Sequence, residues 1–489
     1  MFLTLVLDGG GIMNTSSGAP KPAQPGPRVA IMERLGPQDL MLLWPDDLGW
    51  PETIGALAIL DGTRLLDPDG RFRVEAVREV IESRLPLVPR FRQLLYTPRR
   101  GLGWPLWVDA RSFDLTEHVR VLPLAAPPGE AQLLRTVEQL RALPLDRSRP
   151  LWEMWFLPGL ADDRVAMFMK VHHTIADGAA GVALLGTFLD PSADAPTMPA
   201  RSWTPAPEPS SRDLFEDNLR RRVQAAEGAL SKLLRPAVTL HQAQERWPAV
   251  REGFIKERAP RTSFNIPIGR HRRMAVIHGS LDVTKQIAHN HNAKLNDVLM
   301  SAVAGGLREL LRGREERIED LVLRAFVPIS LHREKPGQAH GNQDGMMFVP
   351  LPIGEADPVR RLQLIAAASA ERKKYVVRPP EGLVARNRVL QRAMVRRFAH
   401  QRWANVYIAN IPGPPIPLYL GGAQLLEVFP LVPISANITL GIAALSYAGQ
   451  LNITVVADAN ALPDIEVFAE GVRNSLQALR SFRARTDAR

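Results

Sequence analysis

A chain of 489 residues is long for a single hydrophobic core, which favours two domains. Its 45% hydrophobic and 23% charged residues are typical of a globular protein and argue against disorder throughout. The sequence holds no cysteine, which excludes thiol nucleophiles, cysteine-bound metals and disulfides and fits a reducing compartment. The net charge of +10 admits anionic partners, but no nucleic-acid motif accompanies it, so nucleic acid is not expected.

The first part of the chain predicts a flexible tail followed by a mixed domain. Residues 1–31 are rich in Gly and Pro and are a poor signal peptide, because no basic segment precedes their short apolar run. We predict an N-terminal domain over residues 32–190. Within it, composition and spacing predict a strand at 55–60, a helix at 74–85, a buried strand at 165–171 and a buried helix at 178–189.

A second mixed domain is predicted after a connector. Residues 191–260 combine a stretch rich in Pro, Ala and Ser with charged helical sequence, as expected of a linker and a helical connector. The remaining domain, residues 261–489, has strand patterns at 274–277, 323–328, 440–447 and 451–457 and a helix pattern at 296–312. Mixed strands and helices in both halves predict an α/β fold, or α+β layers. No apolar stretch approaches the roughly 18 residues of a spanning helix.

The sequence HHTIADG at residues 172–178 separates the buried strand from the buried helix. Adjacent side chains of a strand point to opposite faces, so His172 and His173 are expected to do different work. A neutral imidazole is well suited to accept a proton at pH 7, Asp177 would orient the loop, and Gly178 permits a tight turn into the helix. The residues alone equally permit a buried, hydrogen-bonded His pair. A metal site is disfavoured, because no third ligand is evident.

Residues 386–403 predict a basic amphipathic helix. Arg388, Arg392 and Arg396 are four residues apart and share one face. An apolar row with the same spacing lies roughly 200° around the helix and consists of Leu390, Met394 and Phe398. Such a helix suits an anionic membrane surface or a phosphate-rich ligand, and the alternative is an ordinary solvated face.

An ordered set of short motifs resembles one family of enzymes. From about Met32 to the C-terminus, the chain looks like the bacterial wax ester synthase/acyl-CoA:diacylglycerol acyltransferase family. HHxxxDG alone also occurs in condensation domains and other coenzyme A-dependent acyltransferases, so the ordered set is the more specific signal. The motifs are LGPQD at 35–39, PLW at 150–152, HHTIADG at 172–178, NDV at 296–298, GN at 341–342, NIPGP at 410–414 and SYAG at 446–449.

The resemblance implies two chloramphenicol-acetyltransferase-like domains with a central channel that holds the HHxxxDG loop. His173 would be the general base that takes a proton from an acceptor hydroxyl as this attacks the thioester of acyl-coenzyme A. Neither a cofactor beyond this co-substrate nor an acyl-enzyme is implied. The implied acceptors are diacylglycerol or a long-chain alcohol. A cytoplasmic protein at the inner face of an anionic membrane, or at a lipid-droplet surface, is expected, and Arg388, Arg392 and Arg396 would contact the lipid or coenzyme A phosphates.

Roles for the other motif residues are more open. Asp177 is expected to be structural, together with His172. Asn296 and Asp297 would either line the channel or cap the helix that starts there. Ser446 and Tyr447 would belong to the core or the channel wall. The residues expected to form scaffold are Pro150, Leu151 and Trp152.

Two departures from the family pattern keep other functions open. Gly441 stands where the family often has Asn, and Ala409 stands where Ser often precedes Asn410. Loss of a polar side chain at residue 441 puts the acceptor preference in doubt. The alternatives are a condensation-type enzyme that uses another thioester donor and a lipid-surface binding protein with a decayed site.

Overall fold

The computed structural model describes residues 32–127, 129–176, 178–196, 202–330, 344–377 and 388–481. Glu33–Arg489 form one compact unit. The predicted tail at residues 1–31, the motif at residues 341–342 and Asp177 lie outside the described residues.

The N-terminal sheet has six strands in the order β11-β12-β1-β6-β5-β4. Every residue of β6 is buried, because this strand lies between β1 and β5 and has covered faces. This confirms the buried strand predicted from its apolar sequence. The strands are β1 (Thr53–Leu60), β4 (Val119–Val121), β5 (Trp152–Pro158), β6 (Val165–His172), β11 (Tyr419–Leu420) and β12 (Ala423–Leu431).

The C-terminal sheet also has six strands, in the order β7-β14-β13-β10-β8-β9. Strand β10 runs parallel to both β13 and β8, while the other pairs are antiparallel. These strands are β7 (Arg272–Ile277), β8 (Val322–Ser330), β9 (Asp344–Pro352), β10 (Val406–Pro412), β13 (Leu440–Tyr447) and β14 (Gln450–Asp458). A separate hairpin pairs β2 (Gln93–Tyr96) with β3 (Leu106–Asp109).

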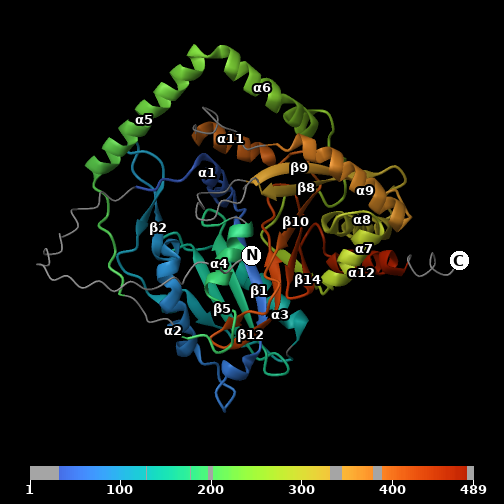
Figure 1. Cartoon of the computed structure of the whole chain (residues 1–489), viewed down its shortest axis with the longest axis horizontal. Coiled ribbons are helices and arrows are strands. Elements are labelled where there is room, and N and C mark those ends of the chain that lie inside the picture. The colour runs from blue at the N-terminus through green and yellow to red at the C-terminus, as the bar shows by residue number, and fades with distance from the viewer. Residues whose placement is uncertain are drawn as a thin grey trace, which may run out of the picture. The chain divides into compact units, whose positions relative to one another are not determined.

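Strand β12 ties the two sheets together. It follows β10 in the sequence, yet it pairs antiparallel with β1 in the N-terminal sheet, where Gly55 lies opposite Leu431. It also packs on β13 and β14 of the other sheet, and in Figure 1 it lies low in the molecule beside β1. The chain therefore builds its N-terminal sheet from both halves of the sequence.

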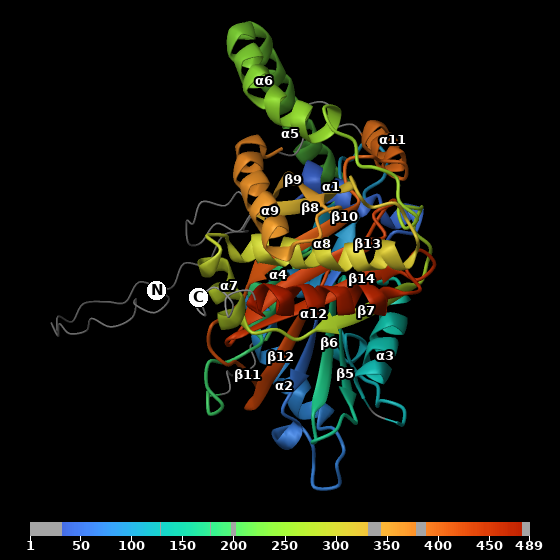
Figure 2. The same cartoon turned by 90° about the vertical axis from the view of Figure 1, so that its right-hand side faces the viewer.

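Helices cover the sheets and define the connector. In Figure 2, α8 and α12 run side by side across the C-terminal sheet, while α5 and α6 form an arch that stands away from both sheets in Figure 1. Among the described residues, none of the helices combines the length and apolarity needed to span a bilayer. The helices are α1 (Pro37–Leu43), α2 (Val74–Arg84), α3 (Glu130–Ala142), α4 (Gly178–Thr187), α5 (Ser211–Leu234), α6 (Pro236–Val250), α7 (Leu281–Asn290), α8 (Leu295–Gly313), α9 (Pro358–Arg372), α11 (Arg388–Phe398) and α12 (Ile465–Ser481).

Most predicted strands and helices occur with ends shifted by a few residues. Two predicted helical segments differ from expectation in burial or in continuity. The helix predicted at 178–189 is only partly buried, with Leu185 covered and Ala183 exposed, because it borders an open cavity. The charged helical stretch breaks between α5 and α6 at Pro236, which lacks a backbone N–H. Amphipathic helices such as α3 and α12 were not predicted.

Contact between α8 and α12 depends on a glycine. A Cβ added at Gly306 would lie 2.6 Å from Val472 Cγ2 and 2.7 Å from the carbonyl oxygen of Phe468, so the two helices approach closely there. We expect Gly306→Ala to lower the free energy of unfolding by about 1–3 kcal/mol, as overpacking usually does. Gly313→Ala is the matched control, because a Cβ at this end of α8 meets nothing within 4 Å. Urea unfolding measures both, and equal effects would contradict the argument.

Candidate active site

The side chain of His172 is fixed on both ring nitrogens. The backbone N–H of Thr174 donates to Nδ1 over 3.1 Å, so the ring proton is on Nε2. Nε2 lies 3.1 Å from Oδ2 of Asp46 and donates to this carboxylate. The His172 ring is buried, and its own backbone N–H donates to the carbonyl of Leu151 over 3.0 Å. His172 therefore holds the end of β6 in place.

Asp46 is the acceptor that orders this end of the strand. It also accepts the backbone N–H of Glu52 at 2.9 Å and the guanidinium of Arg147 at 3.2 Å. Burial by itself would raise the pKa of Asp46, but the hydrogen bonds from His172, Glu52 and Arg147 outweigh it and hold the pKa below its ordinary value. Asp46 is thus a carboxylate at neutral pH. No sequence pattern links Asp46 to His172, because it lies 126 residues earlier in the chain.

His173 points elsewhere, as the strand geometry predicts. Its backbone N–H donates to the carbonyl of Glu52 over 2.8 Å, while the residue lines a cavity of about 410 Å³. Thr53 lies opposite His172 in the β1–β6 pair, so β1 supports the loop from the other side. Of the two histidines, His172 is a fixed support and His173 contacts the cavity.

The cavity lies between the two sheets and is mostly apolar. The N-terminal half contributes β1, β6 and α4, and the C-terminal half contributes β10, β12 and the end of β13. Few polar side chains reach it besides His173: Asn410 and two tyrosines do. Apolar residues of its lining include Ile54, Met169, Val171, Val182, Leu185, Leu418, Leu425, Val428, Leu431 and Leu445. This composition suits a long hydrocarbon chain and offers a single imidazole base.

Two motif residues from the C-terminal half shape the cavity wall. Tyr447 lines the cavity, and its hydroxyl donates to the carbonyl of Leu425 and accepts from the N–H of Leu418, each at 2.8 Å. Ser446 Oγ accepts the N–H of Gly413 at 3.2 Å. The Tyr447 hydroxyl therefore stabilises the wall directly, while the Ser446 hydroxyl holds Gly413, which lies between the lining residues Pro412 and Pro414.

Of the residues Pro150, Leu151 and Trp152, the last two support the end of β6 and the core beside it. The carbonyl of Leu151 accepts the His172 N–H, and the Leu151 side chain is buried near α1. Trp152 is fully buried, stacks on Phe91 with 4.4 Å between ring centroids and donates from Nε1 to the Phe91 carbonyl.

Asn296 and Asp297 lie at the start of α8 and are not among the residues that line the cavity. Asp297 Oδ2 accepts the backbone N–H of Lys294 at 2.9 Å, which is a capping interaction. For Asp297 the geometry thus favours the helix cap over the channel.

The predicted basic helix corresponds to α11 and packs on α1. Its most buried side chains are Gln391 and Val395, and Gln391 accepts the indole N–H of Trp44 at 2.9 Å. Arg392 pairs with Asp47 at 3.0 Å and lies 4.3 Å from the Trp44 ring centroid. Arg396 is exposed, and the Arg388 side chain lies outside the described part. The buried face is thus one position away from the predicted apolar row, and its Gln391 also donates to the carbonyl of Pro37 in α1.

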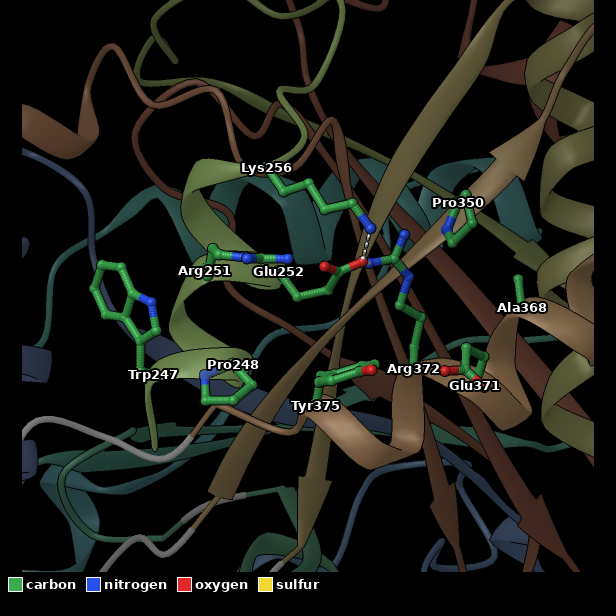
Figure 3. A pocket seen from close by; sticks show the side chains of 10 residues that line it. All are labelled: Trp247, Pro248, Arg251, Glu252, Lys256, Pro350, Ala368, Glu371, Arg372 and Tyr375. Atoms are coloured by element: carbon green, nitrogen blue, oxygen red, sulfur yellow. Dashed lines mark hydrogen bonds and ion pairs between the residues drawn. The ribbon is translucent and has the colours of Figure 1, made fainter. Parts of the chain in front are cut away.

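A second cavity, of about 510 Å³ (Figure 3), shares no lining residue with the His173 cavity. It is bounded by α6, the following helical turn and α9. Its cations are largely neutralised within the protein, since Lys256 and Arg372 both pair with Glu252, at 2.9 Å and 2.6 Å. The His173 cavity is therefore the candidate active site.

The fold matches solved acyltransfer proteins. A wax ester synthase/diacylglycerol acyltransferase from Marinobacter aquaeolei superposes with a TM-score of 0.66 at 23% identity, over 92% of this chain and 99% of that one. The starter condensation domain of rhizomide synthetase, solved with C8-CoA and Leu-SNAC, gives 0.57 at 14% identity over 93% and 94%. The fold is thus the mixed α/β, chloramphenicol-acetyltransferase-like architecture with a cavity between its halves.

Sequence comparison assigns the family. The model of the wax ester synthase/diacylglycerol acyltransferase catalytic domain matches residues 35–299, and that of the C-terminal domain matches residues 340–480. A putative diacylglycerol O-acyltransferase of Mycobacterium tuberculosis is 30% identical over 94% of this chain and 92% of its own length. The chain belongs to the wax ester synthase/diacylglycerol acyltransferase family, and the protein is an acyltransferase.

Gly441 has a steric reason to lack a side chain. A Cβ there would lie 2.9 Å from Cγ2 of Ile434 and 3.2 Å from Cγ2 of Val432. We expect Gly441→Asn to destabilise the fold, and Ile434→Ala to relieve the clash, so the double variant loses less stability than the two single losses combined. Urea unfolding of all four proteins measures this coupling, and strict additivity would contradict it.

The buried carboxyl of Glu52 predicts a pH effect on stability. Burial, reinforced by the charge of Asp46, raises its pKa from 4.5 to about 8 despite nearby Arg141 and Arg272. Between these pH values the unfolded chain loses the proton and the folded protein keeps it, so stability falls by up to about 1.4 kcal/mol per pH unit and levels off above pH 8.

We therefore expect Glu52→Gln to gain stability relative to the wild type as the pH rises from 5 to 8. Urea unfolding at several pH values measures the difference. Glu79→Gln, on an exposed position of α2, is the control and should show no such trend. A Glu52→Gln difference that is constant with pH would contradict the raised pKa.

Proposed function

We propose that this acyltransferase moves a fatty acyl group from acyl-CoA to the hydroxyl of diacylglycerol, of a long-chain alcohol, or of both. The observation that carries the proposal is the position of His173 on a mostly apolar cavity between the sheets, while His172 is fixed by Asp46. The relatives named diacylglycerol O-acyltransferase support the acceptor class. No metal or further cofactor takes part in the proposed reaction.

His173 acts as the general base in the proposed mechanism. Its neutral imidazole takes the proton of the acceptor hydroxyl, whose oxygen attacks the thioester carbonyl of acyl-CoA. The C–S bond then breaks, and the imidazolium returns the proton to the departing thiolate, which leaves the ester and free coenzyme A. Base catalysis of this kind contributes about 10²–10⁴-fold, so positioning by the cavity supplies a large share of the remainder.

His172, Asp46 and Leu151 act by positioning. They fix the end of β6 through the ring and the backbone of His172, which fixes the direction of the next side chain. We propose that Gly178, the first residue of α4, and Asp177, which lies outside the described residues, hold the loop without contacting substrate. In this division one histidine transfers protons and the other stabilises the loop.

The substrates suggest a place of action at a lipid surface. We propose a cytoplasmic enzyme that associates peripherally with the membrane or with lipid droplets. On α11, Val389, Leu390 and Arg396 are all exposed, and this combination of apolar and cationic side chains suits an anionic interface. The condensation-type alternative shares the fold, and the choice of thioester donor distinguishes it.

We expect His173→Ala to lower acyl transfer by about 10²–10⁴-fold with the fold retained, because the variant loses its proton acceptor. The assay uses labelled palmitoyl-CoA with diacylglycerol and hexadecanol, followed by lipid analysis. His289→Ala, at an exposed position of α7, is the control and should keep full activity. Unchanged transfer by His173→Ala would refute the mechanism. Activity only with a carrier-bound thioester would favour the condensation-type alternative, and no turnover of any acceptor would favour a binding protein.

A further inference from the structure

Helix α5 exposes a row of large apolar side chains. The members of the row are four or seven residues apart, and they are between 49% and 74% exposed. They are Phe215, Leu219, Val223, Leu230 and Leu234. At about 100° per residue these positions fall within an arc of about 100°, which is the width of a core-facing stripe. We call this row the α5 stripe.

The α5 stripe faces away from the rest of the protein. The first turns of α5 are anchored by Leu214, which is 1% exposed, by Asp217, which pairs with Arg34 at 2.5 Å, and by Asn218, which donates to the carbonyl of Gly101 at 2.7 Å. On the helical wheel these anchors are centred about 160° from the stripe. An ordinary surface helix buries its apolar side against the core, and this one presents it outward.

The arch keeps this outward side accessible. In Figures 1 and 2, α5 and α6 stand away from the sheets. The helix breaks at Pro236, and Val238 and Leu240 on the first turns of α6 are also exposed. A contiguous exposed apolar surface of this kind marks an interaction site.

Basic residues flank both edges of the α5 stripe. Arg222 lies about 20° beyond one edge and Arg220 about 40° beyond the other. Of the acidic residues nearby, Glu216 is paired with Arg212 at 2.8 Å, and Glu227 lies close to the edge that carries Arg220. Apolar side chains between arginines suit the boundary of an anionic lipid layer, where the acyl region takes the stripe and the phosphates take the guanidinium groups.

We propose that the α5 stripe is the surface by which this protein docks on an anionic phospholipid layer. The proposal rests on the proposed function, since an enzyme whose acceptor is a lipid gains access to it at such a layer. Docking is assigned to the α5–α6 arch, while α11 uses Gln391, Arg392 and Val395 to pack on α1.

The test is flotation of the full-length protein with vesicles of phosphatidylcholine and phosphatidylglycerol. Leu219→Glu/Leu230→Glu should lower the bound fraction by about tenfold or more, because two inserted side chains are lost. Gln224→Glu/Ser231→Glu adds the same charge on an exposed part of α5 outside the stripe and should bind nearly as the wild type does. Binding of the wild type should weaken with phosphatidylcholine alone and with added salt.

Three outcomes would overturn the proposal: no binding by the wild type, equal loss in the two double variants, or a wild-type dimer that the stripe variant dissociates. Light scattering after size exclusion detects the dimer. His173→Ala should bind vesicles normally, and the stripe variant should still transfer acyl groups to a detergent-dispersed acceptor. A failure of the proposed function would instead show as vesicle binding by a wild-type protein that transfers no acyl group.

Discussion

The site depends on one constraint, which is the fixed end of strand β6. Asp46 and the Thr174 N–H occupy both ring nitrogens of His172, and Leu151 and Glu52 accept the backbone N–H groups of the two histidines. Because neighbouring side chains of a strand diverge, fixing His172 directs His173 into the cavity. In the proposed mechanism, the histidine pair thus supplies a support and a base from adjacent positions, at little entropic cost when substrate binds.

A second constraint is that the cavity belongs to neither half alone. Strand β12 enters the N-terminal sheet beside β1, so its residues Val428 and Leu431 face the same space as β6 and β10. The charges near the loop also come from both halves, with Arg141 on α3 and Arg272 on β7 close to Glu52. Arg141 is buried at this junction and donates to the carbonyl of Val432 from the C-terminal half, and burial lowers its pKa to about 9.

Helices α8 and α5 place their apolar residues on opposite sides relative to the rest of the protein. In α8, apolar residues and Gly306 face α12 and the sheet, as in any packed helix. In α5 the anchors Leu214, Asp217 and Asn218 lie on one side and the apolar stripe faces outward on the other. Burial of apolar surface is the main favourable term in folding, and the exposed stripe of α5 contributes little to it. The helix must therefore be held to the protein by contacts on its other side. These contacts are concentrated in the first turns of α5, where Leu214 is buried and Asp217 pairs with Arg34.

The sequence by itself determined the local features of this protein: the buried strand at β6, the helix at α8, the diverging histidines and the family. These depend on short-range periodicity and spacing, which a sequence displays directly. Only the tertiary structure decided that Asp46 holds His172, that β12 completes the N-terminal sheet, and that Ile434 fills the space beside Gly441. It also decided that the α5 stripe faces outward. Each of these depends on contacts between residues far apart in the chain, and a single sequence carries no signal for such pairings.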